Sequence, residues 1–164
     1  MLTGIKGRLL GVSALVVIAD LLTKWWVATA IPVYEVREVV PGLLNLTHVR
    51  NRGVAFGLFN SLGDSGPMVL IVAGVVALVV VAIYFRQTED EERLLLWSLA
   101  LILGGAVGNL IDRVVNGAVT DFVDAYIGTH HWHTFNVADS AISVGICLML
   151  LDLVRERRAR RAAA

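Results

Sequence analysis

Two long apolar segments without a charged residue most constrain how this chain can fold. One runs from Gly66 to Phe85 (20 residues) and the other from Leu94 to Ile111 (18 residues). At a rise of about 1.5 Å per residue, a helix of either length crosses a hydrocarbon core of roughly 30 Å. The whole chain of 164 residues is 57% hydrophobic and only 17% charged, too apolar for an ordinary water-soluble domain. We therefore expect a membrane protein.

Two further apolar segments each contain an acidic residue. Leu9–Trp26 contains Asp20, with Lys24 near its end, and Thr134–Leu151 contains Asp139. Both are long enough to span a bilayer, and the length of the chain fits one domain. The predicted fold is a mainly α membrane protein, a single domain over residues 1–164. Its four transmembrane helices are expected at about residues 9–27, 66–85, 94–112 and 134–153.

The N-terminal segment also has features of a secretory signal. A basic start precedes the apolar stretch, and Ala28-Thr29-Ala30 has the small-x-small form of a cleavage site. However, Asp20 and Lys24 interrupt the part that is purely apolar in a signal peptide, and Trp25-Trp26 is typical of an interfacial anchor. We expect this segment to remain a membrane helix.

The two predicted outer connections, residues 28–65 and 115–133, contain strand-like alternation. It occurs in Val33–Arg37 and Leu44–Val49, with Pro41-Gly42 as a turn between them, and again in Val119–Val123. We expect these pieces to form a small extracytoplasmic β-sheet that rests on the membrane face.

The distribution of basic residues predicts the orientation. Nine lysines and arginines fall on one side of the predicted helices and five on the other, which places both termini and the 87–92 turn in the cytoplasm. The nine are Lys6, Arg8, Arg86, Arg93, Arg155, Arg157, Arg158, Arg160 and Arg161, and the five are Lys24, Arg37, Arg50, Arg52 and Arg113. The C-terminal arginine run then lies against anionic lipid.

Metal and thiol chemistry have little support in the sequence. Cys147 is the single cysteine and lies in an apolar run, so no internal disulfide can form and an inert packing thiol is expected. His130-His131-Trp132-His133 lacks a second ligand set and the H-E-x-x-H spacing of zinc proteases. We predict no metal, no cofactor and no nucleic-acid partner, and a monomeric protein.

Ionisable residues at membrane depth are expensive and are therefore candidates for function. The polar residues of the predicted helices and loops all approach the outer side of the membrane. They are Asp20, Lys24, Asn51, Arg52, Asn109, Asp112, Arg113, Asp121, Asn136 and Asp139. Two carboxylates at a partly dry location share a proton and can act as general base and general acid on a water molecule. Alternatively, Asp112 with Arg113 and Asp20 with Lys24 form ion pairs that only hold helices together. Spacing and depth leave both interpretations open.

Five short motifs, in order along the chain, resemble the lipoprotein signal peptidase (signal peptidase II) family. They are Asp20-Leu21-Leu22-Thr23-Lys24, Asn51-Arg52-Gly53-Val54-Ala55-Phe56-Gly57, the run from Gly104 to Arg113, Val119-Thr120-Asp121-Phe122, and Phe135-Asn136-Val137-Ala138-Asp139-Ser140. Each motif alone is weak, but together they cover the chain from the first predicted helix to the last.

This resemblance implies an aspartic endopeptidase of the bacterial cytoplasmic membrane with its active site near the outer face. The family removes the signal peptide from a prolipoprotein, immediately before a cysteine that carries a diacylglyceryl group. Its catalytic aspartates match Asp121 and Asp139, which activate a water molecule between them. The implied partners are the prolipoprotein and membrane lipid, and no cofactor is needed.

Supporting roles follow from the same resemblance. Amide and guanidinium groups match polar positions around the family's site and can bind the substrate backbone or the developing oxyanion, unless they only link helices. These residues are Asn51, Asn109, Arg113 and Asn136. Gly53 and Phe56 are implied to shape a groove for the small residues before the cysteine. For Asp20, Lys24 and Asp112 we expect a structural role, because opposite charges lie within one helical turn. The Gly104/Gly108 spacing suits close helix packing.

Two other functions remain open. A transporter or channel subunit can use Asp20, Asp121 and Asp139 as a proton path, but this requires ionisable residues across the whole depth of the membrane. A non-catalytic assembly factor tolerates Asp121→Asn. A serine protease is disfavoured, because neither lysine nor histidine lies at helical spacing from Ser140 or Ser143.

Overall fold

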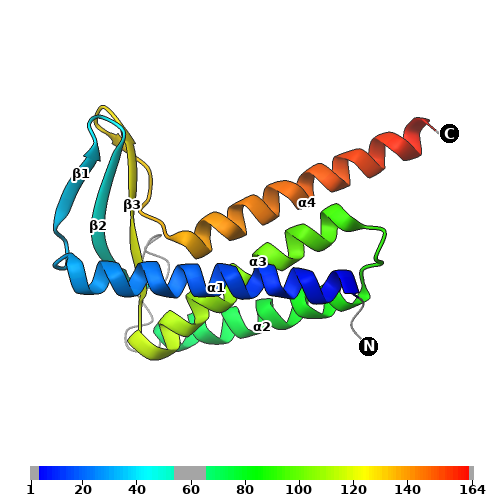
Figure 1. The fold of residues 1–164 in the computed structure, drawn as a ribbon, viewed down its shortest axis with the longest axis horizontal. Coiled ribbons are helices and arrows are strands. Elements are labelled where there is room, and N and C mark those ends of the chain that lie inside the picture. The colour runs from blue at the N-terminus through cyan, green and yellow to red at the C-terminus, as the bar shows by residue number, and fades with distance from the viewer. Residues whose placement is uncertain (1–3, 54–65, 163–164) are drawn as a thin grey trace.

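The computed structural model describes residues 4–53 and 66–162 and shows a helical bundle with a sheet at one end (Figure 1). The helices are α1 (Gly4–Ala30), α2 (Gly66–Gln87), α3 (Arg93–Asn116) and α4 (Val137–Ala162). The sheet stands at the left of Figure 1, and both ends of the chain lie at the opposite end of the bundle. The strands that follow α1 and α3 therefore lie at the end of the bundle opposite the start of α1 and the end of α4.

Among the described residues, three helices are long and apolar enough to cross a membrane. They are Met68–Gln87, Arg93–Asn116 and Val137–Arg161. The prediction of a membrane protein is confirmed. The structure does not confirm four spans: α1 has the length, with 27 residues, but it carries Asp20 and Lys24 within its apolar part.

Helix α3 is the centre of the bundle, because it packs against α1, α2 and α4. In its apolar window 56% of the residues are buried within the chain, against 6% for α2, which turns apolar side chains outward. An exposed apolar surface of this extent is typical of a helix face that contacts membrane lipid. At the end of the bundle away from the sheet, a core forms around Leu96, Leu99 and Phe85.

Glycines on α3 allow its neighbours to approach closely, as the Gly104/Gly108 spacing predicted. A Cβ atom on Gly104 would lie 2.8 Å from the carbonyl oxygen of Ser13 in α1. A Cβ on Gly105 would collide with the carbonyl oxygen of Ala138 at the start of α4. Backbone atoms cannot move aside cheaply, so both helix contacts depend on glycine.

The sheet is antiparallel, with its strands in the order in which they occur in the chain, as expected for a small outer sheet. The strands are β1 (Val36–Val40), β2 (Leu44–Asn51), β3 (Val119–Ile127) and β4 (His130–His131). Gly42, at φ 79°, makes the predicted turn between β1 and β2. The first strand begins at Val36 and not at Val33, because Tyr34 has a left-handed backbone (φ 67°) that a strand cannot contain.

A β-bulge in β2 changes which side chains share a face of the sheet. Leu46 pairs with Val123, whereas Val49 pairs with Asp121, so β2 contains one residue more than β3 between these pairs. Beyond the bulge, Val49 and Asn51 lie on the same face as Asp121.

The segment before α4 is tied to β3. Phe135 and Val123 exchange backbone hydrogen bonds of 3.0 and 2.8 Å, and Asn136 follows as the N-cap. For this reason α4 begins at Val137, although the sequence predicted a helix from residue 134. The pairing fixes the N-terminus of α4 beside β3.

The close contact of α3 with α4 gives a stability prediction. Gly105→Ala should lower the free energy of unfolding by about 1–3 kcal/mol, because the new methyl group overlaps the backbone of Ala138. Gly11→Ala, in α1 with no atom within 4 Å of the new Cβ, should leave stability unchanged or raise it by up to about 1 kcal/mol. Thermal unfolding in detergent measures both. Equal stability of the two variants would contradict the close contact.

Candidate active site

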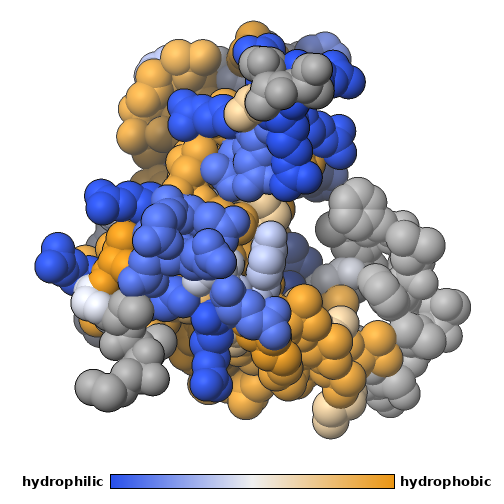
Figure 2. Space-filling model, turned by 90° about the vertical axis from the view of Figure 1, so that its right-hand side faces the viewer, coloured by the Kyte–Doolittle hydropathy of each residue, from blue (hydrophilic) through white to orange (hydrophobic). Residues whose placement is uncertain are grey.

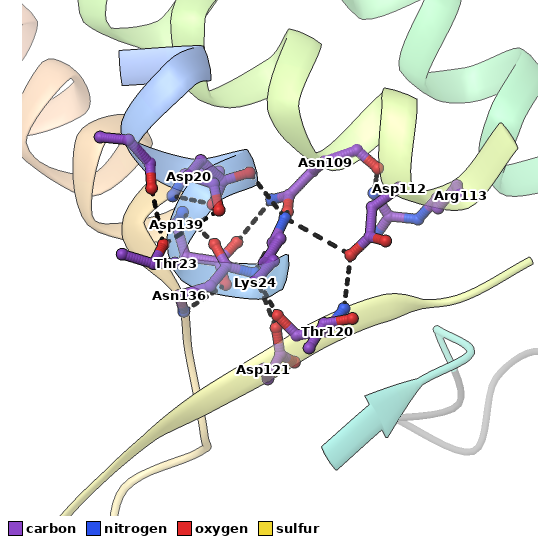
Figure 3. A network of polar contacts seen from close by, with 12 residues as sticks. Asp20, Thr23, Lys24, Asn109, Asp112, Arg113, Thr120, Asp121, Asn136 and Asp139 are labelled. Atoms are coloured by element: carbon purple, nitrogen blue, oxygen red, sulfur yellow. Dashed lines mark hydrogen bonds and ion pairs between the residues drawn. The ribbon is translucent and has the colours of Figure 1, made fainter. Parts of the chain in front are cut away.

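A buried polar network joins α1, α3, β3 and α4 at the sheet end of the bundle (Figure 3), and Asn51 of β2 joins it through Asp121. Hydrogen bonds and ion pairs connect eight residues that the sequence analysis singled out. They are Asp20, Lys24, Asn51, Asn109, Asp112, Asp121, Asn136 and Asp139. The network therefore brings together residues from both ends of the sequence around Asp121 and Asp139.

Asn136 connects the two aspartates. Its side-chain Nδ2 donates to Asp121 Oδ1 at 2.8 Å, and its backbone N donates to Asp139 Oδ2 at 3.2 Å. Its Oδ1 accepts from the backbone N of Asp139 at 2.9 Å. The reciprocal contacts of Asn136 and Asp139 form a capping box at the start of α4. One fully buried side chain thus fixes Asp139 and also holds Asp121.

Asp121 lies on β3 and is 1% exposed. Both of its carboxylate oxygens accept hydrogen bonds from amides, Oδ2 from Asn51 Nδ2 at 2.9 Å and Oδ1 from Asn136. Burial raises the pKa of Asp121 from 3.8 to about 6. The hydrogen bond from Asn51 opposes this rise, and the nearby negative charge of Asp139 adds to it. Asp121 therefore retains a proton more readily than an ordinary aspartate.

Asp139 has a different environment. It is half-buried in the first turn of α4, where the positive end of the helix dipole favours a negative charge. Its Oδ1 accepts from Asn109 Nδ2 at 2.8 Å. Asn109 in turn accepts from Lys24 Nζ at 2.9 Å through its own Oδ1. Asn109 therefore links the buried Lys24 ammonium group to the Asp139 carboxylate through two hydrogen bonds.

Lys24 is the cation of the network, and it is 4% exposed. Its Nζ lies 2.8 Å from Asp20 Oδ2 and 3.6 Å from Asp112 Oδ2. The Asp20–Lys24 pair is the one that the sequence suggested. The suggested pair of Asp112 with Arg113 is not found, because Asp112 turns toward Lys24 and β3. These contacts are consistent with the structural role that the sequence predicted for Asp20, Lys24 and Asp112, and that role stays a prediction.

The other predicted residues lie at the edge of the network or outside the described chain. Arg113 Nη1 donates to the backbone oxygen of Asn109 at 3.4 Å, within its own helix, and not to either aspartate. Gly53 (φ 82°) donates its N–H to Asn51 Oδ1 at 2.8 Å, which orients the Asn51 amide. Phe56 lies outside the described residues.

The histidine cluster forms a separate arrangement on the sheet. His131 Nδ1 lies 2.8 Å from Asp124 Oδ1, and its ring stacks on that of Tyr126 at 4.8 Å. Within residues 4–53 and 66–162, no group of three histidine, cysteine, aspartate or glutamate side chains is placed to hold a metal ion.

Two further contributors are backbone groups that the sequence analysis did not single out. The backbone N–H groups of Thr120 and Ala138 donate to Asp112 Oδ2 (2.6 Å) and Asp20 Oδ1 (2.9 Å). Almost any residue type can supply a backbone N–H donor, so the sequence marks these two residues only by their position next to Asp121 and Asp139. Gly108 leaves the space that the Asp20 carboxylate occupies, since a Cβ there would lie 2.5 Å from Asp20 Oδ2.

The fold with this site is that of a bacterial membrane enzyme. A solved structure of a bacterial membrane enzyme superposes with a TM-score of 0.82 at 30% identity, covering 92% of this chain and 90% of that one. The model of the family Signal peptidase (SPase) II matches residues 12–155. The lipoprotein signal peptidases of Solibacter usitatus and Geobacter metallireducens are 44% and 46% identical, covering 94% and 90% of both chains. The chain belongs to the signal peptidase II family and is a protease, as the resemblance implied.

The raised pKa of Asp121 predicts how stability depends on pH. Between pH 3.8 and about 6 the folded protein keeps a proton on Asp121 that the unfolded chain loses. The stabilisation of the folded state by this proton is complete below pH 3.8 and is lost as the pH rises to about 6. Asp121→Asn removes the ionisable group and with it this loss. Above about pH 6 the free energy of unfolding of the variant should therefore exceed that of wild type by up to about 3 kcal/mol.

Thermal unfolding in detergent between about pH 4 and about pH 8 tests this prediction. The difference between Asp121→Asn and wild type should shrink toward the acid end. Asp152→Asn, in the later turns of α4, is the matched control and should show no such pH-dependent gain. A variant that is less stable than wild type at every pH would contradict the assignment of the proton.

Proposed function

We propose that this protease removes the signal peptide from prolipoproteins, cleaving before a cysteine that carries a diacylglyceryl group, and that Asp121 and Asp139 activate the water. The observation that carries the mechanism is the bridge through Asn136, whose amide and backbone contact both carboxylates. The relatives named lipoprotein signal peptidase support the substrate. This function needs two carboxyl groups in unlike environments and a partly dry site, and the buried Asp121 and half-buried Asp139 support it.

The unlike environments of the two aspartates support different roles for them. Asp121, buried on β3 with a raised pKa, holds the shared proton and is the general acid. Asp139, at the N-terminus of α4 with two hydrogen bonds to its oxygens, is the general base.

The reaction then has two steps. In the first, Asp139 takes a proton from water as its oxygen attacks the scissile carbonyl carbon, and Asp121 gives its proton to the carbonyl oxygen. The product is a neutral tetrahedral diol. In the second, Asp139 returns its proton to the amide nitrogen while Asp121 takes one from a hydroxyl group, and the carbon–nitrogen bond breaks. The pair ends in its initial protonation state, with a free carboxyl group and a free amine as products.

Three amides hold the pair in place. Asn51, Asn109 and Asn136 donate to aspartate oxygens through side-chain nitrogens at 2.8–2.9 Å. A carboxylate that is held by fixed donors needs little reorganisation during proton transfer. We therefore assign these amides to the orientation of the aspartates.

We further propose four spans in the bacterial cytoplasmic membrane, with both termini in the cytoplasm and the aspartates near the outer face. Helix α1 has the length to span, and its C-terminus lies beside the sheet together with the C-terminus of α3 and the N-terminus of α4 (Figure 1). Figure 2 shows the end with both termini, where hydrophilic side chains gather between the apolar surfaces of the helices. The exposed arginines of α4, from Arg155 to Arg161, lie at this end. One chain supplies the whole network, which supports a monomer in membrane lipid.

Processing of a diacylglyceryl prolipoprotein in detergent tests the chemistry. Asp121→Asn and Asp139→Asn should each lower kcat roughly 10²- to 10⁴-fold, because each removes one proton carrier. Asp152→Asn is the matched control and should process at the wild-type rate. Near-wild-type processing by either site variant would favour a structural pair and would reopen the proton-path and assembly interpretations.

Labelling with a membrane-impermeant thiol reagent tests the orientation. In a Cys147→Ser background, Thr129→Cys in the turn after β3 should react in intact cells. Gln87→Cys at the end of α2 and Gly4→Cys at the start of α1 should react only after permeabilisation. Reaction of Gly4→Cys in intact cells would show that α1 does not cross the membrane.

A further inference from the structure

Two buried carboxylates contact the backbone directly beside the proposed catalytic residues. Asp20 Oδ1 accepts from the N–H of Ala138, which precedes Asp139. Asp112 Oδ2 accepts from the N–H of Thr120, which precedes Asp121. The two contacts come from different helices, α1 and α3, but each meets the chain one residue before an aspartate of the pair.

Lys24 connects these two carboxylates. Its Nζ contacts both Asp20 and Asp112, and all three side chains are at most 4% exposed (Figure 3). Asn116 Nδ2 holds the second oxygen of Asp112 at 2.6 Å. The cation, the two acids and the two backbone N–H groups therefore form one chain of contacts from α4 to β3.

We infer that Lys24, Asp20 and Asp112 are positioning residues that set the separation and orientation of Asp121 and Asp139. This inference rests on the proposed function of the two aspartates. A displacement of the backbone at Thr120 or Ala138 also displaces the Cα atom of the aspartate that follows it in the chain. Misplacement of a reacting group by about 1 Å can cost roughly a hundredfold in rate.

Mutual neutralisation alone does not account for this arrangement. Lys24 already has a close partner in Asp20 at 2.8 Å, and Asp112 stands farther away at 3.6 Å. The shortest contact of Asp112 with a neighbouring element is instead its hydrogen bond to Thr120 at 2.6 Å. The geometry of Asp112 is thus set by β3 more than by the cation.

Two substitutions of Asp112 separate positioning from neutralisation. Asp112→Asn keeps the length of the side chain and an oxygen that accepts from Thr120, but it removes the charge. Asp112→Glu keeps the charge but adds a methylene group, which displaces the acceptor and the start of β3. Positioning predicts that Asn preserves kcat better than Glu, whereas neutralisation predicts the reverse order.

The assay measures kcat and KM on a diacylglyceryl peptide, normalised to folded enzyme from gel filtration and thermal unfolding. Asp112→Asn should stay within about threefold of wild-type kcat, and Asp112→Glu and Asp112→Ala should fall roughly 30- to 100-fold with KM within about twofold. Ser13→Ala is the matched control. Ser13 is a buried hydrogen-bonding residue whose Oγ donates to the backbone of Ala100, linking α1 to α3 outside the site. It should lower stability but not kcat.

The positioning role would be overturned if Asp112→Glu had the same kcat as wild type, or if Asp112→Asn had a lower kcat than Asp112→Glu. In that case cleavage by the wild-type enzyme would still support the proposed function. Absence of cleavage by wild type would refute the proposed function and this inference with it. If Asp112→Ala does not fold, the order of the Asn and Glu variants, each with an oxygen acceptor, still decides.

Discussion

A bilayer core offers no hydrogen-bond partners, so polar groups at membrane depth must be satisfied within the protein. In this chain the buried polar groups centre on Lys24, whose charge is met by Asp20 and Asp112 and whose remaining contact goes to Asn109. Helix packing makes these contacts possible, because Gly108 leaves room for the Asp20 carboxylate. The arrangement of α1 against α3 and the polar network thus depend on one another.

The same network gives two aspartates different surroundings. Asp121 is buried on a strand, and Asp139 is half-buried at a helix N-terminus. Proton-transfer chemistry with two carboxyl groups requires such inequality, since two equivalent ionised groups at close range repel each other. Asn136 is the residue through which the strand and the helix are brought to one place, because it belongs to the cap of α4 and also reaches β3. The architecture and the proposed chemistry therefore share the same contacts.

Much of this could be predicted from the sequence, and the missing parts have physical reasons. Apolar length identified α2 and α3, and alternation with Pro41-Gly42 identified the sheet, because these signals are local. The start of β1 was placed too early, since nothing in a single residue type announces the left-handed backbone of Tyr34. Polar residues and the family's motifs pointed to the eight members of the network. The pairing of Asp112 with Lys24 depends on how α1 packs against α3, which spacing along one helix cannot show.

The bulge in β2 has a consequence for how the sequence of this strand is interpreted. With all its residues but no bulge, β2 would continue the register that pairs Leu46 with Val123, and Asn51 would face the side of the sheet opposite Asp121. Deleting one residue between Leu46 and Val49 would remove the bulge, and the regular ladder would still pair Val49 with Asp121 and keep Asn51 on the same face. Strict alternation counted from Leu46 therefore assigns the Asn51 amide to the wrong face, and the position of the bulge carries information that no motif of residue types contains.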